Sequence, residues 1–206
     1  MKKYELVPED TINLGATTVT RIRSLVDIPG VVSVGDLGGY IEHEHNLSHD
    51  GNCWVSDHAT VYDNAKVLGN AIISNNASVY DGARVFGDAE VSDNAMVFDH
   101  AWVYKDAKLY DHAQVYGNAK VSGNAKVYDD AEVYDDAHIF GNAQVSDNAK
   151  VYDDTLVYDN AQVYGDAEVY GDAKVCGMEI LEYGHVSDGI YYGNENHLEV
   201  EDDLER

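Results

Sequence analysis

Residues 59–76 read ATVYDN, AKVLGN and AIISNN, three copies of the six-residue unit that decides the fold. The unit repeats from Cys53 to Val175 without an insertion or a deletion. Its third position is always aliphatic, and its first position is Ala at 19 of 21 sites, with Cys53 and Thr155 as the exceptions. A repeat this short predicts a β-solenoid, because one unit is too small for any larger element.

Each unit has the composition of a short strand followed by a corner. The first and third residues are two positions apart, so both point to the same side of an extended segment. The residue between them is usually polar, as at Lys66, Arg84 and Glu90, and is expected to face solvent. Asp or Gly and then Asn, Asp or His complete the unit, and these types tolerate the positive φ of a tight corner.

A longer, 18-residue period is superimposed on the six-residue period. In every third unit the residue after the aliphatic position is aromatic, while the other two series mix serine, aromatic and aliphatic residues. One face in three therefore differs from the others, which predicts that three units close one coil. About seven coils at a strand spacing of ~4.8 Å would stand ~34 Å tall.

The repeat resembles the hexapeptide repeat of left-handed parallel β-helix proteins, in which an aliphatic and a small side chain fill a triangular prism. This resemblance implies a left-handed winding, which the general preference for right-handed crossovers would not predict. Residues 35–42, 46–48 and 51–55 (GDLGGYIE, NLS and GNCWV) resemble the N-terminal region of phage and prophage proteins that carry this repeat. We therefore expect an all-β, left-handed parallel β-helix of about seven 18-residue coils.

The ends of a solenoid expose strand edges and core, so both ends need covering. Residues 1–52 are predicted to form a small β-rich cap, with the clearest strand at 17–25. Residues 53–177 are expected to form the β-helix, and 178–206 an irregular C-terminal cap and an acidic tail that begins at His197.

The charge balance limits the partners of the chain. A formal net charge of −25 favours a basic partner and disfavours direct binding of nucleic acid or an anionic membrane. No apolar run approaches the ~18 residues of a membrane span, and the start MKKYELVPEDT is not a secretory signal. Cys53 and Cys176 would lie ~33 Å apart and cannot pair. We expect a cytoplasmic protein of a bacterial host cell, without a cofactor.

The aromatic series is the first candidate site. Its rings would stack along one edge of the solenoid, where they either stabilise the fold alone or form an interface, most simply in a homo-oligomer. The series consists of Tyr62, Tyr80, Phe98, Tyr116, Tyr134, Tyr152 and Tyr170.

The acidic corners are the second candidate site. Their carboxylates would lie ~5 Å apart in adjacent coils and could imitate DNA phosphates, which repeat every ~3.4 Å per strand. No calcium-binding consensus is present, so no metal site is predicted. A partly basic stripe of Lys66, Arg84, Lys120, His138 and Lys174 dilutes the mimicry. The candidate acidic residues are Asp129, Asp130, Asp135, Asp136, Asp147, Asp153 and Asp154.

Hexapeptide-repeat proteins are often acyltransferases with a histidine base, and this resemblance provides an enzymatic alternative. His43, His45 and His49 form the one dense histidine cluster, and a further three histidines occupy corners: His58, His100 and His112. The repeat lacks the inserted loop that such enzymes usually carry, so no catalytic residue is assigned. The favoured interpretation is a non-enzymatic, phage-derived scaffold that binds protein. A narrower alternative is a DNA-mimicking inhibitor of a host defence factor, of the anti-CRISPR or anti-restriction type.

Overall fold

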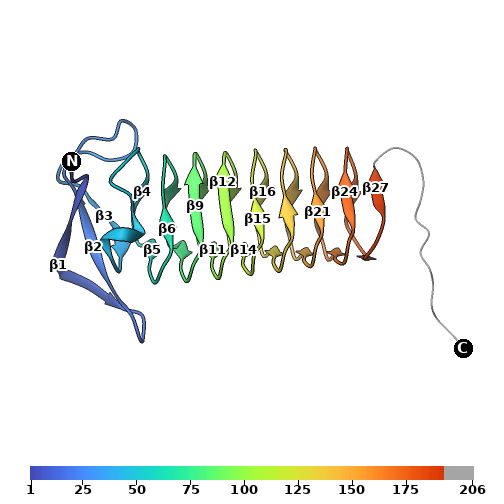
Figure 1. Cartoon of the computed structure of the whole chain (residues 1–206), viewed down its shortest axis with the longest axis horizontal. Coiled ribbons are helices and arrows are strands. Elements are labelled where there is room, and N and C mark those ends of the chain that lie inside the picture. The colour runs from blue at the N-terminus through green and yellow to red at the C-terminus, as the bar shows by residue number, and fades with distance from the viewer. Residues whose placement is uncertain (193–206) are drawn as a thin grey trace, which may run out of the picture.

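The computed structural model describes residues 1–192 and shows a rod of stacked turns with a small antiparallel sheet at its N-terminal end (Figure 1). Three parallel sheets run along the rod, and two of them hold eight strands each, one per turn. The predicted all-β solenoid with an N-terminal β part is confirmed. The left-handed winding stays a prediction, and the acidic tail predicted from His197 lies outside the described residues.

The three sheets are named here by the side chains on their outer surfaces. The ladder face belongs to the sheet of β1 Tyr4–Asn13, β2 Thr18–Ser24, β3 Leu37–Ile41, β5 Thr60–Val61, β8 Ser78–Val79, β11 Met96–Val97, β14 Gln114–Val115, β17 Glu132–Val133, β20 Lys150–Val151, β23 Glu168–Val169 and β26 His185–Val186. The serine face belongs to the sheet of β4 Trp54–Val55, β7 Ile72–Ile73, β10 Glu90–Val91, β13 Lys108–Leu109, β16 Lys126–Val127, β19 Gln144–Val145, β22 Gln162–Val163 and β25 Ile180–Leu181. The basic face belongs to the sheet of β6 Lys66–Val67, β9 Arg84–Gly87, β12 Trp102–Lys105, β15 Lys120–Val121, β18 His138–Ile139, β21 Leu156–Val157, β24 Lys174–Cys176 and β27 Ile190–Tyr192.

The strand register repeats with every third unit, as the aromatic series predicted. Val97 pairs with Val79 on one side and Val115 on the other. Consequently the aliphatic residues of successive turns stack, and those from Val55 to Val175 are at most 1% exposed. Thr155 takes the place of an alanine in this core, and its hydroxyl donates a hydrogen bond to the Tyr152 carbonyl at 2.7 Å.

The corners have the backbone conformation that the sequence predicted. From Asp57 to Gly177 the first corner residue of every unit has φ between 52° and 76°. Glycine, asparagine and aspartate tolerate this region best. Lys105, with φ of 62°, is the one residue of another type at the first corner position in this stretch.

Corner aspartates have a second role that the residue types alone did not reveal. The Oδ2 atom of Asp99 accepts a hydrogen bond from the backbone N–H of Gly117 at 3.1 Å, one turn further along. Asp147 accepts from Gly165 in the same way at 3.0 Å. These N–H groups donate to no backbone carbonyl, so the carboxylate of the preceding turn satisfies a donor that would otherwise need water.

The N-terminal sheet covers the first turn of the rod. Strand β3 pairs with β2 in the antiparallel sense and with β5 in the parallel sense, and thereby joins the two parts. Next to β3 is the 3-10 helix η1, Glu44–Asn46. The buried Lys3 ammonium donates to the Cys53 carbonyl at 2.7 Å. Gly39 is required here, because a Cβ atom would lie 2.6 Å from the Ala59 carbonyl oxygen.

The last described turn loses the strict period. His185 of β26 pairs with Glu168, and Ile190 of β27 pairs with Lys174, so both partners are closer in sequence than the paired residues of the regular turns. Strands β25, β26 and β27 nevertheless extend all three sheets. Ile180 and Ile190 are more than half exposed at this end.

The core stacking predicts the effect of one inward charge. Val115→Asp should destabilise the chain by about 4 kcal/mol or more, because a carboxylate without a partner would enter the fully buried column. Gln114→Asp is the matched control, since this neighbouring side chain is only half-buried, and its change should stay below about 1 kcal/mol. Urea unfolding followed by circular dichroism measures both, and equal losses would contradict the assigned inward and outward positions.

The corner geometry predicts a stabilising substitution. Lys105→Gly should raise the free energy of unfolding by about 0.5–1 kcal/mol, because it removes the Cβ strain of a positive φ. Lys126→Gly places the same change in an exposed strand position. It should lower the free energy of unfolding by about 0.5–1 kcal/mol. Thermal unfolding of the two variants should show shifts of the melting temperature that are opposite in sign. A lower melting temperature for Lys105→Gly would contradict the assigned strain at this corner.

Candidate interaction surface

The predicted aromatic series forms one continuous stack on the ladder face. Neighbouring rings from Tyr62 to Tyr170 have centroid separations of 4.8–5.3 Å and lie within 9° of parallel. All seven rings are half-buried, because each interior ring is covered on both faces by its neighbours. The stack therefore stabilises the solenoid and presents the ring edges outward. Its use as an interface stays a prediction.

Polar residues end the stack on both sides. The register of Ile41 with Val61 places Glu42 in the slot before Tyr62, and the Glu42 carboxylate accepts the Asp63 N–H at 2.7 Å. The register of Val169 with Val186 places Ser187 in the slot after Tyr170. The aromatic strip thus extends over seven successive turns.

Two columns of carboxylates border this strip. The corners between the serine face and the ladder face carry seven acidic residues, and the corners between the ladder face and the basic face carry eight, out of 21 acidic residues in 53–177. The first acidic column consists of Asp57, Asp93, Asp111, Asp129, Asp130, Asp147 and Asp166. The second acidic column consists of Asp63, Asp81, Asp99, Asp135, Asp136, Asp153, Asp154 and Asp172.

The seven aspartates predicted as candidates divide between the two columns. Asp129, Asp130 and Asp147 belong to the first, and the remaining four belong to the second. The residue types alone did not indicate that both columns border the face that carries the aromatic stack. The chain order of the three strand series contained this signal, since the ladder strand always lies between these two corners.

The third corner, between the basic face and the serine face, is different. Glycine occupies five of its seven first positions between residues 69 and 177, with Lys105 and Asp159 at the other two. The three corners share the same backbone conformation, so the corner geometry alone does not demand aspartate. Within residues 1–192, no group of three or more His, Cys, Asp or Glu side chains has an arrangement that could hold a metal ion.

Several tyrosines of the stack have a raised pKa. Burial is the main cause that raises the pKa of Tyr62 and of Tyr134 to about 12, and adjacent tyrosines and carboxylates add to it. Burial and a hydrogen bond to Glu132 raise the pKa of Tyr116 as well. In that bond the Tyr116 hydroxyl donates to Glu132 Oε2 at 3.0 Å. The hydroxyl groups of these three tyrosines therefore stay protonated to a higher pH than that of a free tyrosine.

The predicted basic stripe follows a single sheet. The register places Lys66, Arg84, Trp102, Lys120 and His138 one after another on the basic face. The Arg84 guanidinium lies 5.5 Å from the Trp102 ring centroid, and the Lys120 ammonium lies 6.0 Å from it. Burial, followed by the nearby Lys120 charge, lowers the pKa of His138. Between residues 66 and 174 the strand positions of the basic face carry no acidic residue, whereas the other two faces carry ion pairs such as Lys108–Glu90 and Lys150–Glu132.

The histidine cluster of the acyltransferase alternative is split between two environments. The rings of His43 and His45 are exposed, with centroids 5.1 Å apart. His49 instead stacks on Tyr4 at 4.5 Å, and its Nδ1 accepts the Lys3 N–H at 3.2 Å. The corner histidines His58, His100 and His112 are exposed and belong to different turns.

Comparison with known proteins supports the solenoid. Residues 113–129 match the protein-family model described as YdcK Beta solenoid repeat. The match covers about one turn of the rod, so it identifies the type of repeat and not the family of the whole chain. No curated protein matches the chain. In the part of the chain from residue 1 to 192, no helix has the length and apolar composition needed to cross a lipid bilayer.

The raised tyrosine pKa values predict a loss of stability in alkali. Because the unfolded chain releases these protons near pH 10 and the folded chain near pH 12, the stabilisation is complete below pH 10 and is lost between the two values. Tyr134→Phe should reduce this pH dependence and keep the stack, as Phe98 does in the native chain. Urea unfolding of the native chain and of Tyr134→Phe at pH 8, 10 and 11 measures this pH dependence of stability. Identical pH profiles for the two proteins would contradict the raised pKa of Tyr134.

Proposed function

We propose that the chain is a non-enzymatic scaffold that binds a basic protein through the ladder face and its two acidic columns. The observation that carries this proposal is the position of the acidic corners, which line both edges of the aromatic strip and largely avoid the third corner. An aromatic strip with a charged rim fits the arrangement of a typical protein interface, and Glu132, Lys150 and Glu168 add charged groups on the same face. The net charge of −25 would also accelerate the encounter with a cationic partner.

DNA mimicry is a narrower form of the same proposal. The two acidic columns run in parallel along the rod, as the two phosphate strands do along a duplex. Their carboxylates repeat at the strand spacing of ~4.8 Å, whereas phosphates repeat every ~3.4 Å per strand. A nucleic-acid-binding host defence factor, of the anti-CRISPR or anti-restriction type, would then be the target.

The resemblance supports three further parts of the proposal. Left-handed hexapeptide-repeat proteins frequently self-associate, so we include a homo-oligomer that buries part of the aromatic strip. The N-terminal resemblance to phage and prophage proteins suggests a phage origin, and with it a cytoplasmic location in a bacterial host. An acyltransferase stays an alternative, but the split environments of His43, His45 and His49 do not favour it.

Charge reversal tests the proposed surface. The triple variant Asp130→Lys, Asp136→Lys and Asp154→Lys should abolish capture of a basic protein from bacterial lysate by the tagged chain. The three residues are exposed, lie in both acidic columns and avoid the positive-φ positions, so the fold should be preserved. Mass spectrometry identifies the captured protein, and the capture should weaken as salt is raised.

The matched control carries the same change of charge elsewhere. The control variant carries Asp88→Lys, Glu90→Lys and Asp106→Lys. These residues lie at the third corner and on the serine face, so the variant should still capture the basic protein. Equal losses in both variants would show that the total charge, and not the ladder face, determines binding. Displacement of the captured protein by duplex DNA would favour mimicry. Recovery of the tagged chain alone, as a stable oligomer, would favour a self-assembling rod.

A further inference from the structure

A second aromatic series, on the serine face, contains a gap that the ladder face does not have. Tyr110 and Tyr128 stack there with ring centroids 4.9 Å apart. The next turn has Ser146 in the same position, and the turn after it has Tyr164. Tyr128 and Tyr164 are thus two turns apart, about 9.6 Å at a strand spacing of about 4.8 Å, with one ring missing between them.

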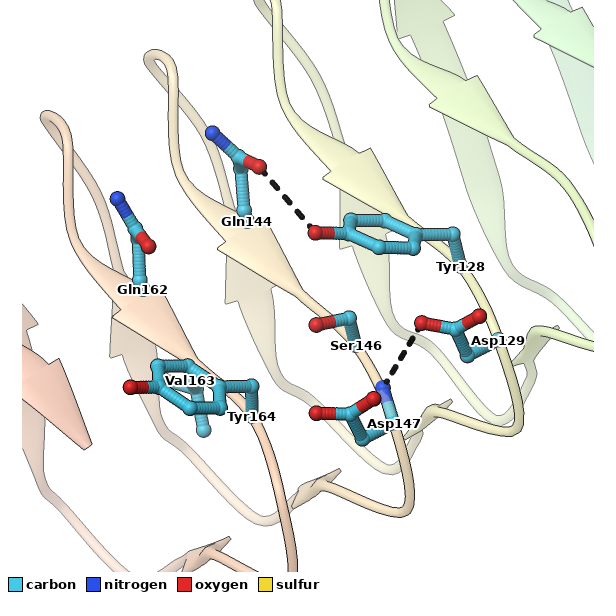
Figure 2. Close-up of a pocket in the computed structure, with 8 residues that line it drawn as sticks. All are labelled: Tyr128, Asp129, Gln144, Ser146, Asp147, Gln162, Val163 and Tyr164. Atoms are coloured by element: carbon cyan, nitrogen blue, oxygen red, sulfur yellow. Dashed lines mark hydrogen bonds between the residues drawn. The ribbon is translucent and has the colours of Figure 1, made fainter. Parts of the chain in front are cut away.

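A hollow of about 300 Å³ occupies this gap. Figure 2 shows Tyr128 and Tyr164 on either side, with Ser146 on the strand between them. Besides these three residues, the hollow is lined by Asp129, Gln144, Asp147, Gln162 and Val163. In every aromatic stack of this chain one ring occupies one turn, so the hollow has room for one planar group between the two tyrosines.

The polar lining of the hollow includes two carboxylates, alongside the Ser146 hydroxyl and the amides of Gln144 and Gln162. Asp129 and Asp147 belong to the first acidic column, and each uses its Oδ2 atom to accept a backbone N–H of the next turn. Among the described residues, no donor reaches their Oδ1 atoms. Gln144 accepts the Tyr128 hydroxyl at 3.4 Å through its Oε1 atom, which holds this ring in place (Figure 2).

We infer that this hollow, here called the serine slot, binds the guanidinium group of an arginine in the basic partner. This inference rests on the proposed function and names the side chain that the partner would contribute. A guanidinium is planar and cationic, so it can stack on two aromatic faces and donate hydrogen bonds to carboxylates at its edge. The lysine ammonium is compact and strongly hydrated, and it matches this geometry less well. A neutral ring would stack but would leave the Asp129 and Asp147 charges uncompensated.

Peptide binding to the full chain tests the serine slot. The probes are acetyl-Gly-Gly-Arg-Gly-Gly-amide and its lysine counterpart, observed by proton NMR during titration with the protein. The arginine δ-methylene resonances should shift upfield, because the ring currents of Tyr128 and Tyr164 act on a group held between them. The arginine peptide should bind at least about fivefold more tightly than the lysine peptide.

Two serine substitutions on the same face separate the slot from the surface charge. Ser146→Tyr supplies the missing ring, so it should abolish the upfield shift and the preference for arginine. Ser92→Tyr adds a ring beside Tyr110, outside the slot, and should leave both unchanged. Both variants extend an existing stack and should be at least as stable as the native chain, which urea unfolding checks.

The outcomes distinguish the serine slot from the proposed function. Equal binding of the arginine and lysine peptides, unaffected by Ser146→Tyr, would overturn the slot even if the acidic columns still captured a basic protein. Loss of arginine binding in Ser146→Tyr, together with its retention in Ser92→Tyr, supports the slot. This second result would stand even if the triple charge reversal at Asp130, Asp136 and Asp154 had no effect on the captured protein.

Discussion

The structure depends on a constant turn of three repeat units between Cys53 and Val175. Most strands here are very short, as in β5 Thr60–Val61, so no strand is stable by itself, and each is held by the turn before and the turn after it. An insertion of a single residue would move inward side chains to the surface. The corner residues maintain the length, because their positive φ turns the chain within a fixed number of residues. A strict register is therefore the condition for a continuous core.

The same register converts any residue that recurs at one position of every third unit into a linear array. Aromatic residues become a stack, cations become a stripe, and aspartates become columns in which like charges repel one another. The third corner shows that glycine and asparagine suffice for the backbone, as at Gly69, Asn70 and Gly123. Corner aspartates accept N–H groups, which offsets part of their repulsion, but this benefit is available at all three corners. The corner geometry therefore does not explain their concentration beside the ladder face, and the proposed partner rests on this concentration.

The sequence predicted those features that follow from periodicity. The six-residue period predicted the strands, the inward positions and the positive φ at corners such as Asp99, and the 18-residue period predicted three sheets. Periodicity could not predict the hydrogen bond from the Gly117 N–H to Asp99, because this bond depends on the side-chain direction at a strained corner. It also could not predict the last described turn, where pairings such as Lys174 with Ile190 no longer follow the period.

The aromatic series of the ladder face and of the serine face have different consequences for binding. In the ladder each interior ring, such as Tyr80, has both faces covered by its neighbours, so a partner can reach only ring edges and hydroxyl groups. Stacking of this kind stabilises the fold whether or not a partner binds. On the serine face, Ser146 interrupts the series and leaves one face each of Tyr128 and Tyr164 uncovered. Face-to-face stacking with a ligand group is therefore available at the gap and not along the ladder. The unbroken ladder therefore offers a partner a broad surface of ring edges, whereas the gap at Ser146 can accept a single ligand group between two rings.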